Sequence, residues 1–508
     1  MATDRNILFI LLDQLRADCV FGALADHVCL PNMRRLAAEG VRFDRHYSAA
    51  NPCGPARASI LTGLWPMTHR SVRNGTPLAA HHPTLPRALR AGGVEPLLYG
   101  YTDTTLDPRG MAPADPALKS YEMPMPGFTE VLAMRFDESL PWQGHLRTLG
   151  YALPPYARFY APVAAPGRPA RIDDPAFYAA EHSDTAFLTD RFLEDIAVRR
   201  LHPWCALLTY IRPHPPFVAP APFNRLVDPA TLPLPVRTAD PAGEAARHPF
   251  LGPALDHAPA RCFVQGVDPF PDTAEGHQAM RAVYLGLAAE VDAHLGRVMD
   301  WLEASGQAAG TLVVLASDHG EMLGDHWVWG KSHVFEPAWR VPLIIRDPER
   351  PAQAGRVVDA FTSHVDLAPT LLDWMGLQIP AAMDGASLLP FLDGATPAGW
   401  RDHVVSELDV ADLEAPTVWQ RRLALAPDCC NLTAIREDRW KLVHFNGGLP
   451  PLLFDLVADP DEMTDLAADP AHQGEVLRLT RKLLDHRLRH ADHALSGMQA
   501  TAVGVIGR

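Results

Sequence analysis

Five short, mostly apolar runs constrain the fold of this chain more than any other feature of its sequence. Each run ends in polar residues and precedes a stretch with a helical pattern. The runs are Ile7–Leu12, Val94–Tyr99, Cys205–Ile211, Thr311–Ala316 and Val341–Ile345. Apolar runs of this length are typical of strands buried on both faces, as in a parallel sheet covered by helices. The sequence therefore predicts such a sheet.

Helical patterns occupy the segments between these runs. They cover Met33–Glu39, Leu85–Ala91, Thr185–Val198, Met280–Ser305 and Leu367–Met375. This alternation predicts an α/β, doubly wound domain, in which ligands bind outside the carboxyl ends of the strands. The polar residues at those ends are Asp13-Gln14, Gly100–Asp103, Arg212–His214, Ser317–Gly320 and Arg346–Pro348. We expect them to share one site.

The pattern changes in the last fifth of the chain. Short strand-like pieces precede a helical tail at Glu475–Ala494; the pieces are Val404–Leu408, Leu432–Arg436, Trp440–Phe445 and Leu452–Leu456. We predict a catalytic domain over residues 1–400 and a smaller C-terminal α+β subdomain over 401–508, with an antiparallel sheet and a closing helix. Two Pro-rich stretches, Leu153–Arg171 and Pro213–Pro259, are expected to be surface loops that wall the site, contact another subunit or simply connect elements.

Charge and cysteine content exclude several classes of protein. The net charge is −15 and basic tracts are missing from the sequence, so nucleic acid and anionic membrane surfaces are poor partners. The seven cysteines are sparse and odd in number, which argues against a disulfide scaffold. The apolar run that ends at Asp13 is too short for a secretory signal, and other segments are shorter than a membrane span. We expect a cytoplasmic protein.

The run from Cys53 to Gly63, Cys-Gly-Pro-Ala-Arg-Ala-Ser-Ile-Leu-Thr-Gly, carries the strongest chemical pattern. Pro55 suits the first position of a helix and Arg57 would lie in its first turn. The Cys53 sulfur would then lie at the positive end of the helix, which favours an anionic nucleophile or an anionic ligand. The alternative is a small buried cysteine at the end of a core helix.

Asp13, Asp318 and His319 form a candidate metal site. Carboxylates at two strand ends and an adjacent imidazole offer mixed oxygen and nitrogen ligation to one divalent ion. The imidazole favours manganese, iron or zinc over calcium or magnesium. The alternative for Asp318-His319 is a turn with a capping aspartate.

The Cys53-x-Pro55-x-Arg57 spacing followed by Thr62-Gly63 resembles the motif of formylglycine-dependent sulfatases. In that family a formylglycine-generating enzyme oxidises the cysteine to an aldehyde, which hydrates to a geminal diol. Asp13-Gln14 and Asp318-His319 replace the Asp-Asp and Asp-Asn pairs of calcium sulfatases. These substitutions look like the phosphonate monoester hydrolase branch of the alkaline phosphatase superfamily, and the likeness covers nearly the whole chain.

The resemblance implies an alkaline-phosphatase-like fold and a full set of site residues. Cys53 becomes the formylglycine and a fourth metal ligand, and Mn²⁺ is the expected ion, with Zn²⁺, Fe²⁺ or Ca²⁺ as alternatives. Arg57 and Lys331 would stabilise charge on the transferring group, and His214 or Lys331 would protonate the leaving oxygen. The residues implied to surround the substrate are Gln14, Asn74, Tyr101, Asp103 and His333. Lys331 could instead be a solvated lysine, and His333 could lie behind the site.

Asp103 departs from the pattern of the phosphonate hydrolases, for which a second threonine is expected after Tyr101. A carboxylate there would repel a dianionic phosphate monoester more than a monoanionic ester. Sulfate monoesters, phosphonate monoesters and phosphate diesters each carry one negative charge. Asp103 could therefore shift preference toward sulfate esters, or it could be a solvated loop residue.

These features predict a hydrolase of small monoanionic esters. The first hypothesis is an arylsulfatase-type sulfuric ester hydrolase that also cleaves phosphonate monoesters and phosphate diesters; the alternative is a phosphonate monoester hydrolase or phosphodiesterase. A phosphatase of the same superfamily with an unmodified nucleophile, and a metal-stabilised binding protein, are less consistent with the motif. The loops and the resemblance also favour a homo-oligomer, a dimer or a tetramer.

Overall fold

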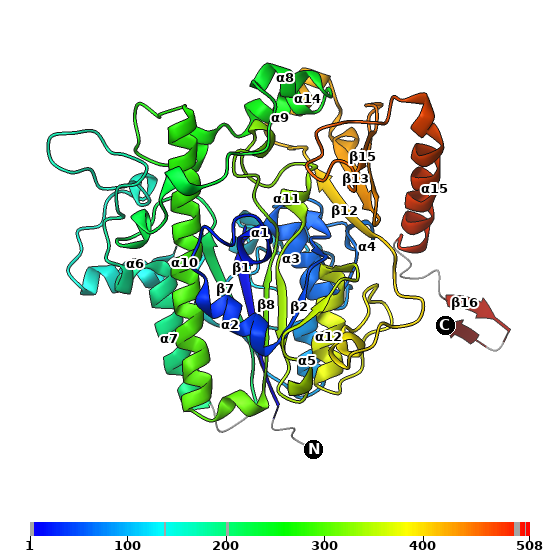
Figure 1. Cartoon of the computed structure of the whole chain (residues 1–508). Helices are drawn as coiled ribbons and strands as arrows, with labels where there is room; N and C mark the ends of the chain where they lie inside the picture. The colour runs from blue at the N-terminus through cyan, green and yellow to red at the C-terminus, as the bar shows by residue number, and fades with distance from the viewer. Residues whose placement is uncertain (1–4, 137–138, 200–202, 492–497, 503, 508) are drawn as a thin grey trace.

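A computed structural model describes residues 5–136, 139–199, 203–491, 498–502 and 504–507 (Figure 1). Its centre is an eight-stranded sheet with the order β10-β2-β9-β8-β1-β7-β5-β6. The strands are β1 Asn6–Asp13, β2 Val41–Phe43, β5 Pro96–Gly100, β6 Thr129–Ala133, β7 Cys205–Pro213, β8 Thr311–Ser317, β9 Leu343–Arg346 and β10 Arg356–Val358. Strands β8, β1, β7, β5 and β6 run parallel to one another. The predicted mostly parallel α/β sheet is confirmed.

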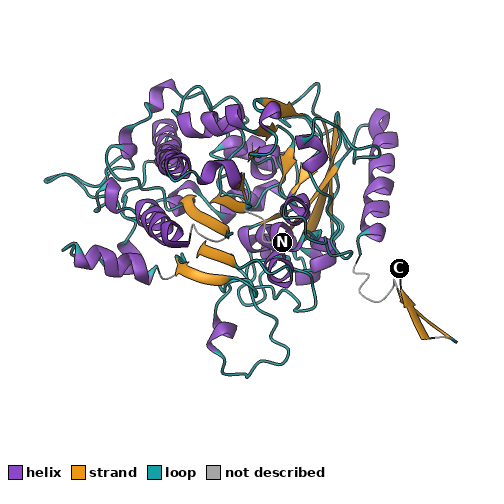
Figure 2. Ribbon diagram, turned by 90° about the horizontal axis from the view of Figure 1, so that it is seen from below, coloured by secondary structure: helices purple, strands orange, loops and turns teal. Residues whose placement is uncertain are grey.

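Helices cover both faces of this sheet, as Figure 2 shows from below. All eight residues of β1 are buried, and the six from Ile7 to Leu12 alternate between two apolar clusters. One cluster packs under α2 (Pro31–Glu39), α7 (Asp184–Arg199) and α10 (Ala274–Ala304). The other packs under α3 (Cys53–Thr62), α5 (Leu85–Ala91) and α12 (Leu367–Trp374). A strand with apolar side chains on both faces has no solvated side, which explains its continuous apolar sequence.

Two details of the central domain differ from expectation. Strand β9 runs antiparallel to β8 and β2, so Arg346 and Asp347 leave the sheet at the edge opposite the other four strand ends. Asp347 there binds Arg350 and the Trp374 indole. Helix α3 begins at Cys53 rather than at Pro55, and all ten of its residues are buried.

The C-terminal region forms a second sheet with the order β15-β14-β13-β12-β4. Strands β12 (Val404–Asp409), β13 (Asn431–Arg436), β14 (Trp440–Phe445) and β15 (Leu452–Asp455) are antiparallel, as predicted. Strand β4 (Ala50–Asn51) comes from the N-terminal region and pairs parallel to β12. The segment directly before Cys53 is therefore part of this sheet. The division of the chain at residue 400 stays a prediction.

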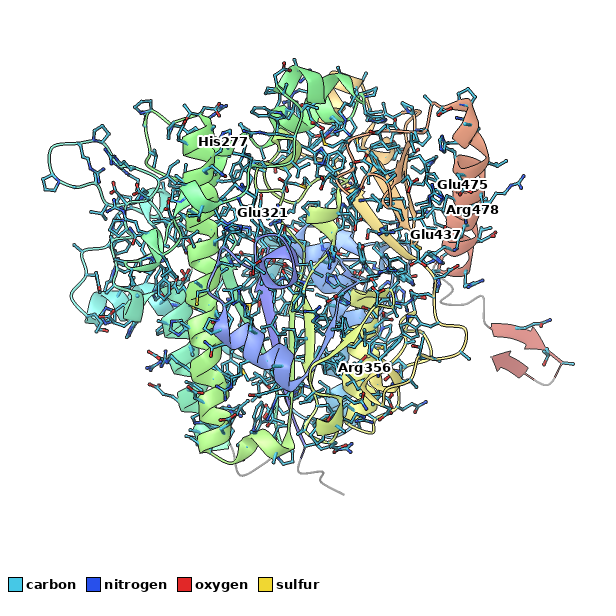
Figure 3. All side chains as sticks on the ribbon, in the orientation of Figure 1. His277, Glu321, Arg356, Glu437, Glu475 and Arg478 are labelled. Carbon is cyan, nitrogen blue, oxygen red and sulfur yellow. The ribbon has the colours of Figure 1, made fainter. Side chains whose placement is uncertain are left out.

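The closing helix α15 (Gln473–Arg489) packs on the second sheet, at the right of Figure 1. Arg478 on this helix pairs with Glu475 and Glu437, which Figure 3 labels together. The helix ends before the predicted Ala494, and residues 492–497 lie outside the described part.

Shorter elements are α1 Asp18–Phe21, α4 Pro66–His69, α6 Leu140–Thr148, α8 Pro241–Ala246, α9 Leu251–His257, α11 Glu336–Trp339, α13 Leu389–Leu392, α14 Val418–Leu423, β3 His46–Tyr47, β11 Thr362–Ser363, β16 Met498–Thr501 and β17 Gly504–Gly507. Within the described ranges, none of the helices combines the length and the apolar character that crossing a bilayer requires.

The packing of α15 gives a first prediction. Leu479 is fully buried between this helix and the second sheet, so Leu479→Ala should lower the free energy of unfolding by about 2–5 kcal/mol. Leu477→Ala is the matched control, because Leu477 on the same helix is 52% exposed and its truncation should change stability by less than about 0.5 kcal/mol. Urea unfolding measures both, and equal losses would show that α15 is not packed in this way.

Candidate functional site

Four predicted metal ligands converge at the carboxyl edge of the central sheet. Asp13 ends β1, Asp318 and His319 follow β8, and Cys53 begins α3. Their ligand atoms all lie within 4.8 Å of one another, and all four residues are buried. The convergence follows from topology, because neighbouring parallel strands place their carboxyl ends side by side.

Acceptor atoms of Asp13, Asp318 and His319 face one another in this cluster, as they would around a cation. Nδ1 of His319 lies 3.0 Å from the Gly320 carbonyl, to which it donates, so its Nε2 presents a lone pair. That Nε2 lies 3.6 Å from Oδ1 of Asp13 and 3.6 Å from Oδ1 of Asp318. Oδ1 of Asp13 is buried and accepts no hydrogen bond from any described residue. Burial and the Asp13 carboxylate raise the pKa of Asp318 to about 7. Facing acceptors of this kind fit one divalent ion.

Arg57 donates hydrogen bonds from its guanidinium group to the cluster and to the residues beside it. Its Nε donates to Oδ2 of Asp318 at 2.9 Å, and one terminal nitrogen donates to Oδ2 of Asp13 at 3.2 Å and to the Tyr101 hydroxyl at 3.0 Å. The other terminal nitrogen donates to the Tyr101 carbonyl at 3.1 Å and to Thr209 Oγ1 at 2.8 Å. Its five donors are therefore engaged. Arg57 orients the two carboxylates and brings one positive charge to the cluster.

Tyr101 and Asp103 complete the environment of Arg57. The Tyr101 hydroxyl donates to Oδ2 of Asp13 at 2.7 Å, and its ring lies 4.1 Å from the Arg57 guanidinium carbon. Asp103 is only 7% exposed, and its Oδ2 lies 3.7 Å from Nε of Arg57. The alternative that Asp103 is a solvated loop residue is therefore wrong. Burial raises the pKa of Asp103 to about 8, although Arg57 acts in the opposite direction.

Cys53 and Lys331 are in direct contact. Nζ of Lys331 lies 3.1 Å from Sγ of Cys53 and 3.0 Å from Oε1 of Gln14, so Lys331 is not a solvated lysine. Burial and the nearby Asp13 carboxylate raise the pKa of Cys53 well above its usual value. A thiol in this place stays protonated, which argues against an activated thiolate as the nucleophile.

Three other predicted residues lie in different settings. Oδ1 of Asn74 accepts the Gly54 N–H at 2.9 Å, so Asn74 caps the start of α3 beside Cys53. His214 lies at the end of β7, and burial together with the Lys331 charge lowers its pKa to about 3, which leaves the ring neutral. His333 stacks on Phe335 with ring centroids 4.6 Å apart, in the apolar cluster beside the second sheet. Neither of its ring nitrogens has a hydrogen-bond partner among the described residues, so this position does not support a role in substrate binding.

Two residues that support the cluster have no role in the predictions made from the sequence. Thr209 accepts a hydrogen bond from Arg57, and it is a polar residue within the mostly apolar run Cys205–Ile211, which is a recognisable signal. Glu321 is fully buried and contacts Gln14. It belongs to the Asp-His-Gly-Glu sequence, whose first two residues alone were assigned a function.

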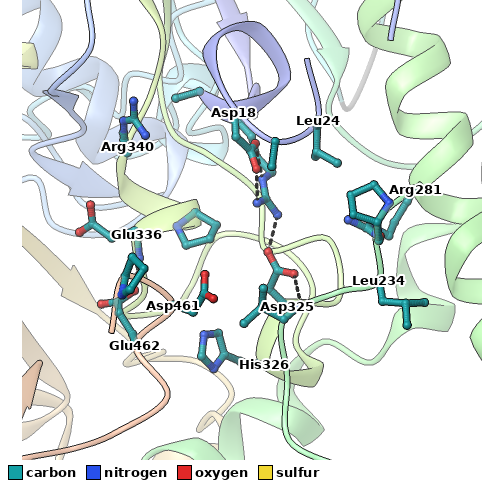
Figure 4. Close-up of a pocket in the computed structure, with 17 residues that line it drawn as sticks. Asp18, Leu24, Leu234, Arg281, Asp325, His326, Glu336, Arg340, Asp461 and Glu462 are labelled. Atoms are coloured by element: carbon teal, nitrogen blue, oxygen red, sulfur yellow. Dashed lines mark hydrogen bonds and ion pairs between the residues drawn. The ribbon is translucent and has the colours of Figure 1, made fainter. Parts of the chain in front are cut away.

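A cavity of about 270 Å³ lies beside the loop that follows β8, where Asp325 and His326 line it (Figure 4). Arg16 lines it and pairs with Asp18 at 2.6 Å and Asp325 at 2.8 Å, as the dashed lines in Figure 4 show. None of the predicted site residues lines this cavity. The Arg16–Asp325 pair ties the segment after β1 to the loop after β8, and thus helps to hold Gln14 close to Glu321, whereas the Arg16–Asp18 pair lies within the first segment.

Comparisons with known proteins agree with this geometry. The sulfatase family model matches residues 5–377, and the model for the N-sulphoglucosamine sulphohydrolase C-terminal region matches residues 324–489. The solved phosphonate monoester hydrolase SpPMH from Silicibacter pomeroyi is 50% identical, with a TM-score of 0.96 and 99% of both chains covered.

Two curated relatives extend the comparison. The multifunctional alkaline phosphatase superfamily protein PehA of Trinickia caryophylli is 39% identical over 100% of this chain and 99% of its own length. The choline-sulfatase of Rhizobium meliloti is 29% identical over 96% of this chain and 87% of its own length. These matches confirm the resemblance inferred from Cys53, Pro55 and Arg57. The chain therefore belongs to the sulfatase family and is a hydrolase.

Proposed function

We propose that this protein is a metal- and formylglycine-dependent hydrolase of small monoanionic esters, with phosphonate monoesters as its first substrate class. The observation that carries the proposal is the position of Cys53, whose Sγ lies 3.4 Å from His319 Nε2 and 3.1 Å from Lys331 Nζ inside a buried cluster of acceptors. The full-length likeness to a phosphonate monoester hydrolase at 50% identity supports the substrate class.

Sulfate esters are the second candidate class, and Asp103 is the observation that favours them. The non-bridging oxygens of a phosphonate or phosphate ester carry more negative charge than those of a sulfate ester. When it is ionised, above its pKa of about 8, the buried Asp103 carboxylate weakens the local positive potential beside Arg57 and so disfavours the ester whose individual oxygens carry more of the single negative charge. Asp103 would then raise sulfate hydrolysis relative to phosphonate hydrolysis.

Asp13, Asp318, His319 and the residue at position 53 would hold the metal, with Mn²⁺ preferred and Zn²⁺, Fe²⁺ or Ca²⁺ as alternatives. A divalent ion in this place supplies Lewis acidity and a lowered pKa for a bound oxygen. Formylglycine at position 53 supplies a hydrated aldehyde with two hydroxyls, one to attack and one whose ionisation releases the product.

The other residues of the site orient these groups and supply protons. Arg57 fixes Oδ2 of both aspartates, so that Oδ1 of Asp13, which has no partner among the described residues, and Oδ1 of Asp318, which also accepts the Gln14 and His319 N–H groups, would face the metal. Lys331 contacts position 53 and carries a proton, because the surrounding negative groups raise its pKa although burial acts against them. We therefore assign Lys331 as the proton donor to the leaving oxygen. His214 is neutral in this environment, so we do not assign it as that donor.

Several further expectations are part of this proposal. A formylglycine-generating enzyme would act on Cys53 during maturation, and the mature protein would be a cytoplasmic dimer or tetramer of identical chains. Neither nucleic acid nor a membrane would be a partner, which the net charge of −15 supports.

Mass spectrometry of the Cys53 peptide tests the proposed modification. In protein from a host that converts the motif, we expect the sulfur of Cys53 to be replaced by oxygen. Cys205, which is also buried but lies in a strand without the motif, is the internal control and should keep its thiol. An unmodified Cys53 in fully active protein would contradict the proposal.

Asp103→Thr tests the substrate preference. Measured above the Asp103 pKa of about 8, where the group is ionised, removing this carboxylate should raise the ratio of phenyl phosphonate monoester to aryl sulfate hydrolysis, as kcat/KM, by about tenfold, equivalent to about 1.4 kcal/mol. Asp107→Thr is the matched control, since Asp107 lies in the same loop but pairs with Arg109 at the surface. An unchanged ratio in Asp103→Thr would remove Asp103 from the specificity argument.

A further inference from the structure

Glu321 is a buried carboxylate fixed by the backbone of its own loop. It lies three positions after Asp318, near the centre of the molecule in Figure 3. One oxygen, Oε1, accepts the N–H of Leu323 at 3.0 Å and the N–H of Gly330. The other, Oε2, accepts from Nε2 of Gln14. Because two of these donors are main-chain groups, the carboxylate keeps its place whether or not a substrate is bound.

This contact decides which end of the Gln14 amide faces the catalytic centre. An ionised carboxylate only accepts hydrogen bonds, so the amide nitrogen must point to Glu321. Oε1 then points the other way and accepts from Nζ of Lys331 at 3.0 Å. With the amide reversed, oxygen would face the Glu321 carboxylate and an NH₂ group would face the Lys331 ammonium, and both contacts would be repulsive.

The main chain of Gln14 is held independently. Its φ is 71°, in the left-handed region, its N–H donates to Oδ1 of Asp318 at 3.1 Å, and its carbonyl accepts the Tyr284 hydroxyl at 2.7 Å. The N–H and the carbonyl of Gln14 are thus both fixed by hydrogen bonds. The side-chain amide can still take two orientations, and the contact with Glu321 selects one of them.

We propose that Glu321 is a positioning residue that sets the orientation of the Gln14 amide, so that Oε1 faces the catalytic centre and keeps the Lys331 ammonium against the residue at position 53. The chain of contacts runs Glu321–Gln14–Lys331–Cys53 and ends at 3.1 Å between Nζ and Sγ. The inference rests on the proposed function for the identity of the reacting group. It assigns to Glu321 an indirect role, without contact to substrate.

A purely structural role is the competing explanation, because Glu321 also closes the loop through Gly330. Glu321→Gln separates the two roles. The Leu323 and Gly330 N–H groups require an oxygen at position 321, so the new NH₂ group turns toward Gln14 and forces its amide to reverse. The loop keeps its hydrogen bonds, but Lys331 then faces a donor.

The experiment is a double-mutant cycle on the metal-loaded enzyme with Glu321→Gln and Gln14→Met, the latter a residue of similar length without an amide. Readouts are kcat and KM on the best ester substrate, the affinity for Mn²⁺ by calorimetry, and Tm. Outer partners of a metal site typically contribute 10- to 100-fold. We expect each single variant to lower kcat and Mn²⁺ affinity by about 10- to 100-fold with little change in Tm, and Glu321→Gln to have no further effect on the Gln14→Met background. Glu290→Gln, at an equally buried glutamate of α10, is the control and should behave as wild type.

The outcomes that would overturn the role of Glu321 differ from the outcome that would overturn the proposed function. Wild-type kcat and Mn²⁺ affinity in Glu321→Gln, or an equal loss on the Gln14→Met background, would overturn the proposal. If Glu321→Gln does not fold, a wild-type kcat in Gln14→Met alone would overturn it, because Glu321 is proposed to act through Gln14. If the wild-type enzyme cleaves none of the three ester classes, the proposed function fails, and the Mn²⁺ affinities of the same variants still decide the role of Glu321.

Discussion

The buried guanidinium of Arg57 is the interaction on which the rest of the site depends. It lies among three buried carboxylates, those of Asp13, Asp318 and Asp103. Uncompensated charges in such an environment are strongly destabilising, and removing one partner of a buried pair typically costs several kcal/mol. Arg57 neutralises part of the negative charge and, by engaging Oδ2 of Asp13 and of Asp318, turns the remaining oxygens toward His319. The acceptor atoms that face one another there, Oδ1 of Asp13, Oδ1 of Asp318 and Nε2 of His319, would be bridged by a divalent cation.

The C-terminal sheet constrains the position of the segment that precedes Cys53. Strand β4 pairs with β12 and ends at Asn51, two residues before Cys53. The side chain of Asn51 also donates to the Lys331 carbonyl at 2.9 Å. The second sheet therefore fixes both the residues directly before α3 and the loop that carries Lys331. Through these contacts the second sheet supports the positions of Cys53 and Lys331.

Much of the fold could be predicted from the sequence, and the failures have physical causes. All five apolar runs are strands, but an apolar run carries no information on its direction, so the antiparallel course of β9 and the remote position of Asp347 could not be foreseen. Strand β4 is too short for any periodicity. The metal cluster was predictable because carboxyl ends of parallel strands share an edge. The burial of Asp103 and the contact of Glu321 with Gln14 depend on loop conformation, and the position of His333 on packing against Phe335, which no local pattern specifies.

The central claim is that position 53 and the carboxyl edge of the sheet form one metal-dependent reaction centre. Anomalous diffraction from crystals of enzyme purified with Mn²⁺ tests it most directly. The account predicts one manganese peak bounded by Asp13 Oδ1, Asp318 Oδ1 and His319 Nε2, together with the loss of the sulfur signal at residue 53. A manganese peak elsewhere in the molecule, or a sulfur signal retained at residue 53 in active enzyme, would contradict it.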